Sequence, residues 1–261
     1  MSAQVGNAAK ERLAAGELAL GVILRQARTV DVAPVMKAAG YDWLFLDLEH
    51  NSMDLDMAVQ ISVAALGAGI APIARVPARQ LWMANRILDG GGLGIVMPHV
   101  DTPEEAKTIA AALRYPPIGH RSVAGGLPHL RYEKHSLAET CAAINDATMV
   151  IVMLETPQAI ANADAIAAVP GIDSLLIGTN DLAMELGIPG GFGDERIVAA
   201  YQAVVDACKR HGKHAGVGGI ADQALLKRYI EMGVRVVLPG SDLSFMQSAA
   251  SATAATMRGF L

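Results

Sequence analysis

Residues 149–182 read MVIVMLETPQAIANADAIAAVPGIDSLLIGTNDL, and this stretch decides the fold. Two apolar runs, each typical of a buried strand, flank a segment of helical length, which is the order of a βαβ unit. The first run ends on Glu155 and the second on Asp181. Carboxyl ends of parallel strands meet at one edge of a sheet, where such folds collect catalytic groups. The stretch therefore predicts a parallel α/β fold with two carboxylates at that edge.

The same alternation of apolar runs and amphipathic segments extends along the 261 residues. It predicts eight strands, at residues 19–25, 43–50, 71–77, 92–100, 149–156, 174–181, 214–220 and 234–240. Segments of helical period separate them, many closed by Gly as helix ends are. Eight such repeats predict a (β/α)8 barrel, or TIM barrel, as a single domain over residues 1–261.

Two segments do not fit the repeat. Residues 243–258, LSFMQSAASATAATMR, have helical character but no following strand, so this helix should pack outside the barrel or on a neighbouring molecule. Residues 115–135 form a long interruption rich in Pro, Gly and basic residues. A loop of this length on a compact domain is usually an active-site cover or an assembly element.

Composition narrows the class of protein. The formal charge is −5, and no basic tract with interleaved aromatics is present, so neither nucleic acid nor an acidic membrane surface is an expected partner. Residues 1–16 lack the apolar core of a signal peptide, and no later run is long enough to cross a bilayer. We expect a cytoplasmic enzyme that acts on a small molecule.

The predicted strand ends carry a chemically coherent set of polar residues. Beside the two acids already named, they are Asp47, Glu49, His50, Arg75, His99 and Asn180. Glu155 and Asp181 taken singly have structural explanations, as a helix N-terminal acid and an N-cap. Together with the others they predict a site for a divalent metal ion, because two carboxylates fill two positions of a hard cation and leave room for a bidentate 2-oxo acid.

Most of the remaining residues suggest a role. Arg75 is placed to stabilise an enolate oxygen, and His50, oriented by Asp47, is the expected proton-transfer group. Backbone N–H groups of Gly178, Thr179 and Asn180 are expected to receive a substrate carboxylate. His99 touches substrate or is a structural loop histidine, two roles that the sequence does not separate. No lysine falls at a strand end, so Schiff-base chemistry has no nucleophile.

These residues resemble the HpcH/HpaI aldolase family of metal-dependent, class II pyruvate aldolases. The motifs that carry the resemblance, in family order over about residues 18–240, are FLDLEH, ARVP, ILDGGGLGIVMPHVDTPEEA, RYPPIGHRS, LETPQAIANADAIAAVPGID and IGTNDLAMELGIPG. The resemblance implies a Mg, Mn or Co ion on Glu155 and Asp181. It also implies a C-terminal helix exchanged between subunits of a trimer of dimers, and an acid, Asp89, that reaches the neighbouring subunit's pocket.

The chain departs from the family pattern at several positions. Leu48 replaces a small residue, Asn51-Ser52 replaces a proline, Met153 stands where many relatives carry Gln, and RSVAGG replaces the commoner RGVG. These changes leave the proposed metal pair, Arg75 and His50 in place. They therefore affect the prediction of which substrate is bound more than the prediction of which reaction is catalysed.

The function expected is therefore a carbon–carbon lyase. It would cleave a 4-hydroxy-2-oxo acid, such as 4-hydroxy-2-oxoheptanedioate or 2-keto-3-deoxy-glucarate, to an aldehyde and pyruvate through a metal-stabilised enolate. Three alternatives stay open: an acyl-CoA lyase of the malyl-CoA or citryl-CoA type, a citrate-synthase-like condensing enzyme, and a noncatalytic 2-oxo acid sensor.

Overall fold

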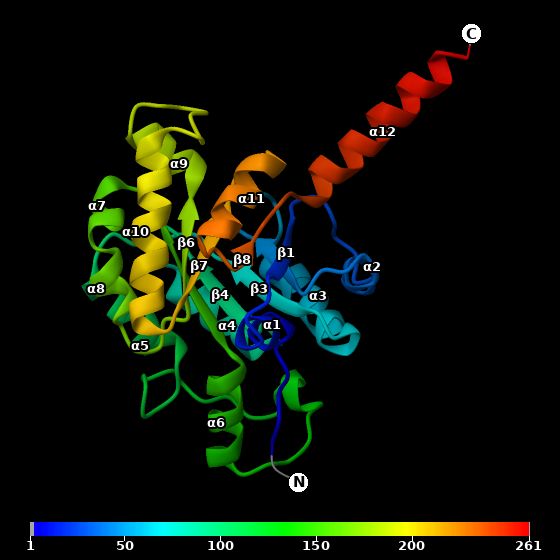
Figure 1. The fold of residues 1–261 in the computed structure, drawn as a ribbon. Coiled ribbons are helices and arrows are strands. Elements are labelled where there is room, and N and C mark those ends of the chain that lie inside the picture. Colours follow the sequence, from blue (N-terminus) through cyan, green and yellow to red (C-terminus); the bar gives the residue numbers. More distant parts are fainter. Residues whose placement is uncertain (1–2, 261) are drawn as a thin grey trace.

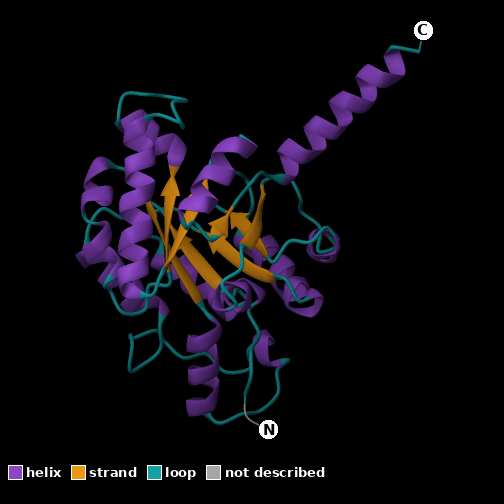
Figure 2. Cartoon of the chain, viewed as in Figure 1, coloured by secondary structure: helices purple, strands orange, loops and turns teal. Residues whose placement is uncertain are grey.

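A computed structural model describes residues 3–260 of the chain. Its strands close into one parallel barrel in sequence order, with β1 pairing to β8 (Figures 1 and 2). This closed barrel with interleaved helices confirms the predicted (β/α)8 fold. The strands are β1 (Ala19–Leu24), β2 (Trp43–Asp47), β3 (Ala71–Arg75), β4 (Gly94–Met97), β5 (Met149–Leu154), β6 (Ser174–Gly178), β7 (His214–Gly218) and β8 (Val236–Val237).

Helices surround the barrel, and several begin at caps that the sequence encodes. Thr102 with Glu105, and Ser136 with Glu139, form capping boxes in which side chains satisfy the free N–H groups of the first helical turn. The helices are α1 (Ala8–Ala14), α2 (Val32–Ala38), α3 (Leu55–Ala68), α4 (Leu81–Asp89), α5 (Pro103–Leu113), α6 (Leu137–Ala147), α7 (Pro157–Ala161), α8 (Ala163–Ala167), α9 (Thr179–Glu185), α10 (Glu195–His211), α11 (Gln223–Met232) and α12 (Asp242–Arg258), with a short 3-10 turn, η1 (Pro128–Leu130).

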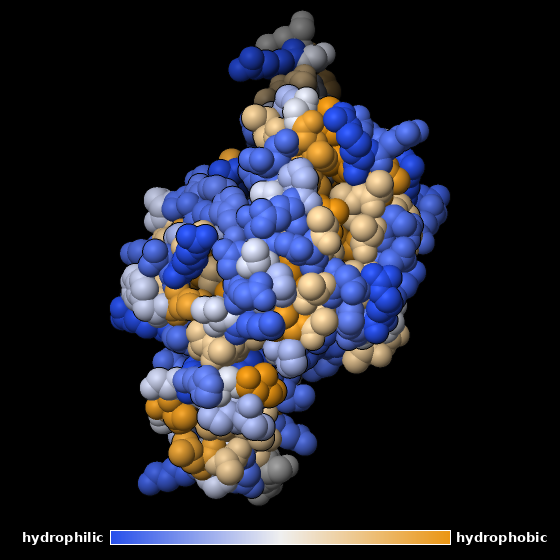
Figure 3. All heavy atoms as spheres, turned by 90° about the vertical axis from the view of Figure 1, so that its left-hand side faces the viewer, coloured by the Kyte–Doolittle hydropathy of each residue, from blue (hydrophilic) through white to orange (hydrophobic). Residues whose placement is uncertain are grey.

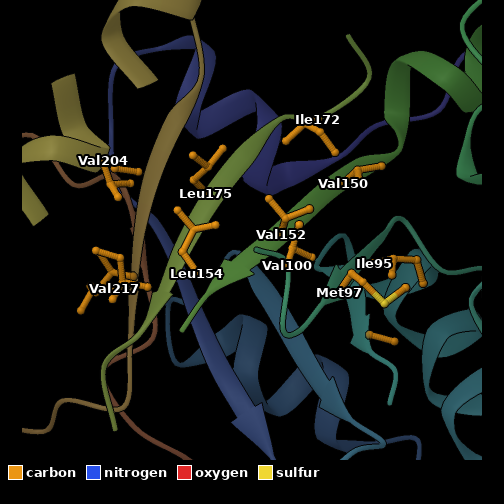
Figure 4. Close-up of a cluster of buried hydrophobic side chains, with 14 of the residues drawn as sticks. Ile95, Met97, Val100, Val150, Val152, Leu154, Ile172, Leu175, Val204 and Val217 are labelled. Carbon is orange, nitrogen blue, oxygen red and sulfur yellow. The ribbon is translucent and has the colours of Figure 1, made fainter. Parts of the chain in front are cut away.

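The strands are buried on both faces, which explains their continuous apolar sequences. Alternate residues pack outward against the helices, as Val150, Val152 and Leu154 of β5 do beside Leu175 and Val217 in Figure 4. The intervening residues fill the barrel interior in a second cluster: Trp43, Phe45, Ile73, Met149, Ile151, Met153 and Leu176 belong to it, among others. The interior side chains nearest the carboxyl ends of the strands therefore form the floor of any cavity at that end of the barrel.

Residues 115–135 lie at the opposite end of the barrel from that opening. They connect α5 through η1 to α6, and α6 leads into the start of β5, so the segment sits at the amino ends of the strands (Figure 1). Part of it, Pro128 to Glu133, lines a second cavity of about 670 Å³ together with residues of α3 and the N-terminal segment. Its interpretation as a cover of the chain's own active site is therefore wrong, because a helix-to-strand connection cannot reach the far end. An assembly role stays a prediction.

Helix α12 leaves the barrel and extends away from it (Figure 1), and none of its residues is buried. On the face of the molecule drawn in Figure 3, hydrophobic residues occur in small groups among hydrophilic ones. Within residues 3–260, every helix is too short or too polar to span a bilayer.

Candidate active site

A cavity of about 420 Å³ opens at the carboxyl end of the barrel. Interior side chains of the strands, including Phe45, Met153 and Leu176, form its apolar floor. Seven residues that the sequence predicts as functional line it: Asp47, His50, Arg75, Gly178, Thr179, Asn180 and Asp181. Its volume lies within the range of small-molecule sites. The position of Met153 in the floor means that the departure from Gln exchanges a polar contact for an apolar one at this place.

Glu155 follows β5 and lies directly against the backbone of β6. A Cβ added to Gly178 would stand 2.7 Å from Glu155 Oε1 and 2.6 Å from its Cγ, so only glycine leaves room for this carboxylate. The side chain is 2% exposed. Burial, together with the negative charges of Asp181 and Glu49, raises the pKa of Glu155 above its ordinary value despite a hydrogen bond from the His99 backbone. An excess of negative charge at this point favours the binding of a cation.

Two residues outside the expected catalytic set, His99 and Glu49, complete the surroundings of Glu155. The His99 backbone N–H donates to Glu155 Oε2 at 2.6 Å, and its Nδ1 lies 3.1 Å from the same oxygen. His99 adopts a positive φ of 55°, a strained conformation for a residue other than glycine. Glu49 Oε2 is buried without an aligned hydrogen bond, although Arg75 Nη1 lies 3.2 Å away. Their places at strand ends were the available signal in the sequence, but spacing alone did not assign them a role.

Arg75 and Asp47 form the most tightly defined pair in the cavity. Arg75 Nε and Nη2 donate to the two oxygens of Asp47 at 2.9 and 2.8 Å, a bidentate arrangement between adjacent strands β3 and β2. Burial acts to raise the pKa of Asp47, but the hydrogen bonds and charge of Arg75 and the backbone N–H groups of Glu49 and His50 outweigh it and lower the pKa. Asp47 is thus an ionised anchor that fixes the guanidinium.

The structure does not bring the Asp47 carboxylate to the His50 imidazole as the sequence suggested. Asp47 Oδ1 accepts the backbone N–H of His50 at 3.3 Å, while both carboxylate oxygens are engaged by Arg75. The nearest acid to the ring is Glu49, whose Oε2 lies 3.8 Å from His50 Nε2. The side chain of His50 is 57% exposed at the cavity wall. Asp47 therefore positions the loop of His50 rather than its ring.

Residues 178–180, predicted to bind a substrate carboxylate through their backbone N–H groups, have different surroundings in the structure. Thr179 is buried, and its hydroxyl bonds to Tyr201 Oη at 2.7 Å and donates to the Gly218 carbonyl at 2.8 Å, so the side chain serves packing. Asn180 and Asp181 are exposed to the cavity. Helix α9, which these residues begin, has only seven residues, so it offers a weak dipole.

Asp89 lies apart from all of these residues. It ends α4, at the amino end of the barrel, and its Oδ1 accepts from Arg121 Nη2 at 2.5 Å. Arg121 is buried there and stacks over the ring of Tyr115. Asp89 thus contributes nothing to its own chain's cavity, and a catalytic role requires a second subunit.

The donor set at Glu155 and Asp181 fits a hard divalent cation. Both residues offer carboxylate oxygens, the ligand type that Mg²⁺ and Mn²⁺ prefer. Among residues 3–260, no group of three or more His, Cys, Asp or Glu side chains is arranged to hold a metal ion. A two-carboxylate site suits an ion that keeps several positions for water and substrate, whereas a closed structural site would need more protein ligands.

Fold and site together define a (β/α)8-barrel enzyme with a carboxylate-rich cavity at the carboxyl ends of its strands. The sequence model described as HpcH/HpaI aldolase/citrate lyase matches residues 24–249. The chain belongs to this family, as its motifs suggested, and is an aldolase of it.

This chain is similar to two aldolases in sequence and to a solved structure in fold over most of its length. A 4-hydroxy-4-methyl-2-oxoglutarate aldolase of Hapsidospora irregularis is 37% identical, with 88% of this chain and 86% of the relative covered. A 5-keto-4-deoxy-D-glucarate aldolase of Escherichia coli is 33% identical, with 97% of each chain covered. The crystal structure of an HpcH/HpaI aldolase from Desulfitobacterium hafniense superimposes with a TM-score of 0.90 at 27% identity, covering 95% of this chain and 96% of the other.

Proposed function

We propose that this protein is a divalent-metal-dependent aldolase that cleaves a 4-hydroxy-2-oxo acid to pyruvate and an aldehyde. One observation carries the proposal: Asp181 lines the cavity in which Asp47 fixes the guanidinium of Arg75, and Glu155, which follows the neighbouring strand, lies against Gly178 in the wall of that cavity. The names of the two aldolase relatives support this substrate class, because one names a branched 4-hydroxy-2-oxo acid and the other a keto-deoxy sugar acid.

Each side chain has a defined task in this reaction. A divalent ion, when bound, supplies Lewis-acid polarisation of the 2-oxo group. Arg75 Nη1, which points past Asp47 toward Glu49, places positive charge where the enolate oxygen develops, and the bidentate anchor prevents reorganisation. His50, exposed at the cavity wall, is the group that moves the proton. Asp47 and Glu49 hold these two residues in place.

The test is deuterium exchange into the methyl group of pyruvate, followed by proton NMR. We expect exchange with the Mg²⁺- or Mn²⁺-loaded protein and none after chelator treatment, with recovery when the ion is restored. His50→Ala should slow exchange by about 100-fold while pyruvate binding stays nearly unchanged, because general acid–base catalysis contributes about 10²–10⁴-fold. Exchange that persists in chelator would refute the metal requirement, and an unchanged rate in His50→Ala would remove His50 from this role.

We further propose that the active form is a homo-oligomer built from dimers that exchange α12, arranged as a trimer of dimers. Three observations support it: no residue of α12 is fully buried in its own chain, large apolar side chains such as Phe245 (38% exposed), Met246 (58%) and Met257 (55%) are exposed on it, and Asp89 lies at the end of the barrel away from its own cavity. Exposed apolar side chains on an unpacked helix favour association.

Light scattering coupled to size exclusion measures the state directly. We expect a hexamer, and we expect Phe245→Asp with Met246→Asp to dissociate it because a charge in an apolar interface is costly. A monomeric wild-type protein that exchanges pyruvate protons at full rate would contradict the proposal.

A further inference from the structure

We propose that Arg25 binds a second carboxylate of the substrate, at the end farthest from the 2-oxo acid. The enzyme would thereby select 4-hydroxy-2-oxo dicarboxylates over monocarboxylates of equal length. This inference rests on the proposed function and adds to it a residue that determines specificity at the distal end of the substrate. It is carried by the position of Arg25 in the cavity, by the absence of an ion-pair partner for its guanidinium among residues 3–260, and by the hydrogen bonds that hold its backbone.

Arg25 lies on the wall of the cavity opposite the metal-binding acids. It directly follows β1, and β1 lies across the eight-stranded ring from β5, which leads into Glu155. Both Arg25 and Asp181 line the cavity. A substrate whose 2-oxo acid end is held at β5 and β6 therefore extends its other end across the opening, toward the loop after β1.

The guanidinium of Arg25 is available for an anion. Arg25 is exposed and forms no ion pair with any carboxylate of residues 3–260. Arg75, the other arginine of the cavity, is engaged by Asp47 and by Glu49. One arginine is thus committed to the reacting end of the cavity, while the second stands free at its far wall. A guanidinium presents a planar fork that matches a carboxylate.

The loop that carries Arg25 is held from both sides. The Asp242 carboxylate accepts the backbone N–H groups of Arg25, Gln26 and Ala27 at 2.9, 2.8 and 2.7 Å. From the other side, Arg28 Nη1 donates to the carbonyls of Arg25 and Ala27, both at 3.0 Å. Because the backbone is fixed while the side chain is unpaired, the entropy lost when Arg25 binds an anion is confined to its side chain.

The departure at Asn51-Ser52 contributes to this support. Arg28 Nη2 lies 3.4 Å from Asn51 Oδ1 and 3.3 Å from Ser52 Oγ, contacts that a proline at this place would lack. The residues that replace the expected proline therefore brace the loop of Arg25 against the loop after β2.

The experiment compares two ligands that differ only in a distal carboxylate. Isothermal titration calorimetry with the Mn²⁺-loaded protein measures the Kd of 2-oxoadipate and of 2-oxohexanoate, six-carbon 2-oxo acids that lack the 4-hydroxyl needed for cleavage. We expect the wild type to prefer 2-oxoadipate by about 10- to 100-fold, the range of a charge-assisted hydrogen-bonded contact. Arg25→Met should remove the preference by weakening 2-oxoadipate alone, and Arg25→Lys should restore part of it.

Arg79→Met is the matched control. Arg79 follows β3 at the same end of the barrel, is 85% exposed, pairs with Glu105 and lies outside the cavity, so its replacement removes the same charge from the same face. We expect it to keep the wild-type preference. Equal affinity for both ligands in the wild type, binding of neither, or equal loss in both arginine variants would overturn the role of Arg25.

Failure of this inference is distinguishable from failure of the proposed function. Deuterium exchange into pyruvate does not involve a distal carboxylate, so the exchange rates of the wild type and of Arg79→Met report on the reaction independently of Arg25. Exchange without a dicarboxylate preference would reject Arg25 and leave the aldolase reaction intact. A dicarboxylate preference without exchange would reject the reaction and leave Arg25 as an anion-binding residue.

Discussion

Replacement of Glu155 by Gln is expected to abolish metal-dependent pyruvate exchange and to weaken Mn²⁺ binding by more than about 100-fold. Changes to outer-shell partners of metal ligands cost about 10- to 100-fold, and removal of a carboxylate ligand from a two-carboxylate site should exceed that range. Gln keeps the shape of Glu155 and can still accept the His99 N–H, so the fold should persist. Mn²⁺ affinity is measured by electron paramagnetic resonance and the exchange rate by NMR.

Two further variants make this prediction specific. Gly178→Ala should weaken Mn²⁺ binding by about 10- to 100-fold without altering any ligand, because its Cβ would stand 2.7 Å from Glu155 Oε1 and must displace it. Glu104→Gln removes an exposed acid of α5 and should leave both readouts unchanged. Wild-type Mn²⁺ affinity in Glu155→Gln would exclude Glu155 as a ligand.

Replacement of Arg75 by Lys is expected to lower the kcat of aldol cleavage by about 10²- to 10³-fold, the effect of losing one fixed donor at a developing oxyanion. Lys keeps the charge but cannot form the two parallel hydrogen bonds to Asp47, so the cation is no longer positioned. Mn²⁺ affinity should stay near the wild-type value because Arg75 is not a metal ligand.

Steady-state kinetics and thermal unfolding together test the role of Arg75. Asp47 is 2% exposed, so partial loss of its partner should also lower the melting temperature. Asp47→Asn, which keeps one acceptor for Arg75, should lie between wild type and Arg75→Lys in kcat. A kcat for Arg75→Lys within threefold of the wild type would show that charge alone suffices and that the bidentate anchor has no catalytic value.

The barrel could be predicted because its strands are buried on both faces. Each run of apolar, β-branched residues between amphipathic segments became a strand, since only a parallel sheet covered by helices buries both faces. The predicted ends of the strands were less accurate. The eighth strand was expected at residues 234–240, but β8 comprises only Val236 and Val237. The segment of helical length between the two strands of residues 149–182 forms two short helices that meet at Asn162, whose side chain donates to the Asp101 carbonyl.

The composition of the site could be predicted from the strand ends, but its contacts could not. Position along a strand places Asp47 and His50 in one cavity, yet only the register of β2 against β3 turns both oxygens of Asp47 toward Arg75. The positive φ of His99, which brings its N–H to Glu155, has no signature in sequence spacing. Arg25 was missed because an arginine after a strand is ordinarily solvated, and only the closed ring brings it to the common cavity.

The hydrogen bonds from the loop of Arg25 to the Asp242 carboxylate join segments that are synthesised far apart in time. Arg25 and the carboxylate that receives its backbone N–H are 217 residues apart in the chain. Beside them, the first and last strands share only two paired positions, Ala19 with Val236 and Leu20 with Val237. The entropy of closing so long a loop grows slowly with length, so the separation adds little to the equilibrium cost. A nascent chain nevertheless emerges with the loop of Arg25 first, so the wall of the cavity is completed only after Asp242 has been synthesised.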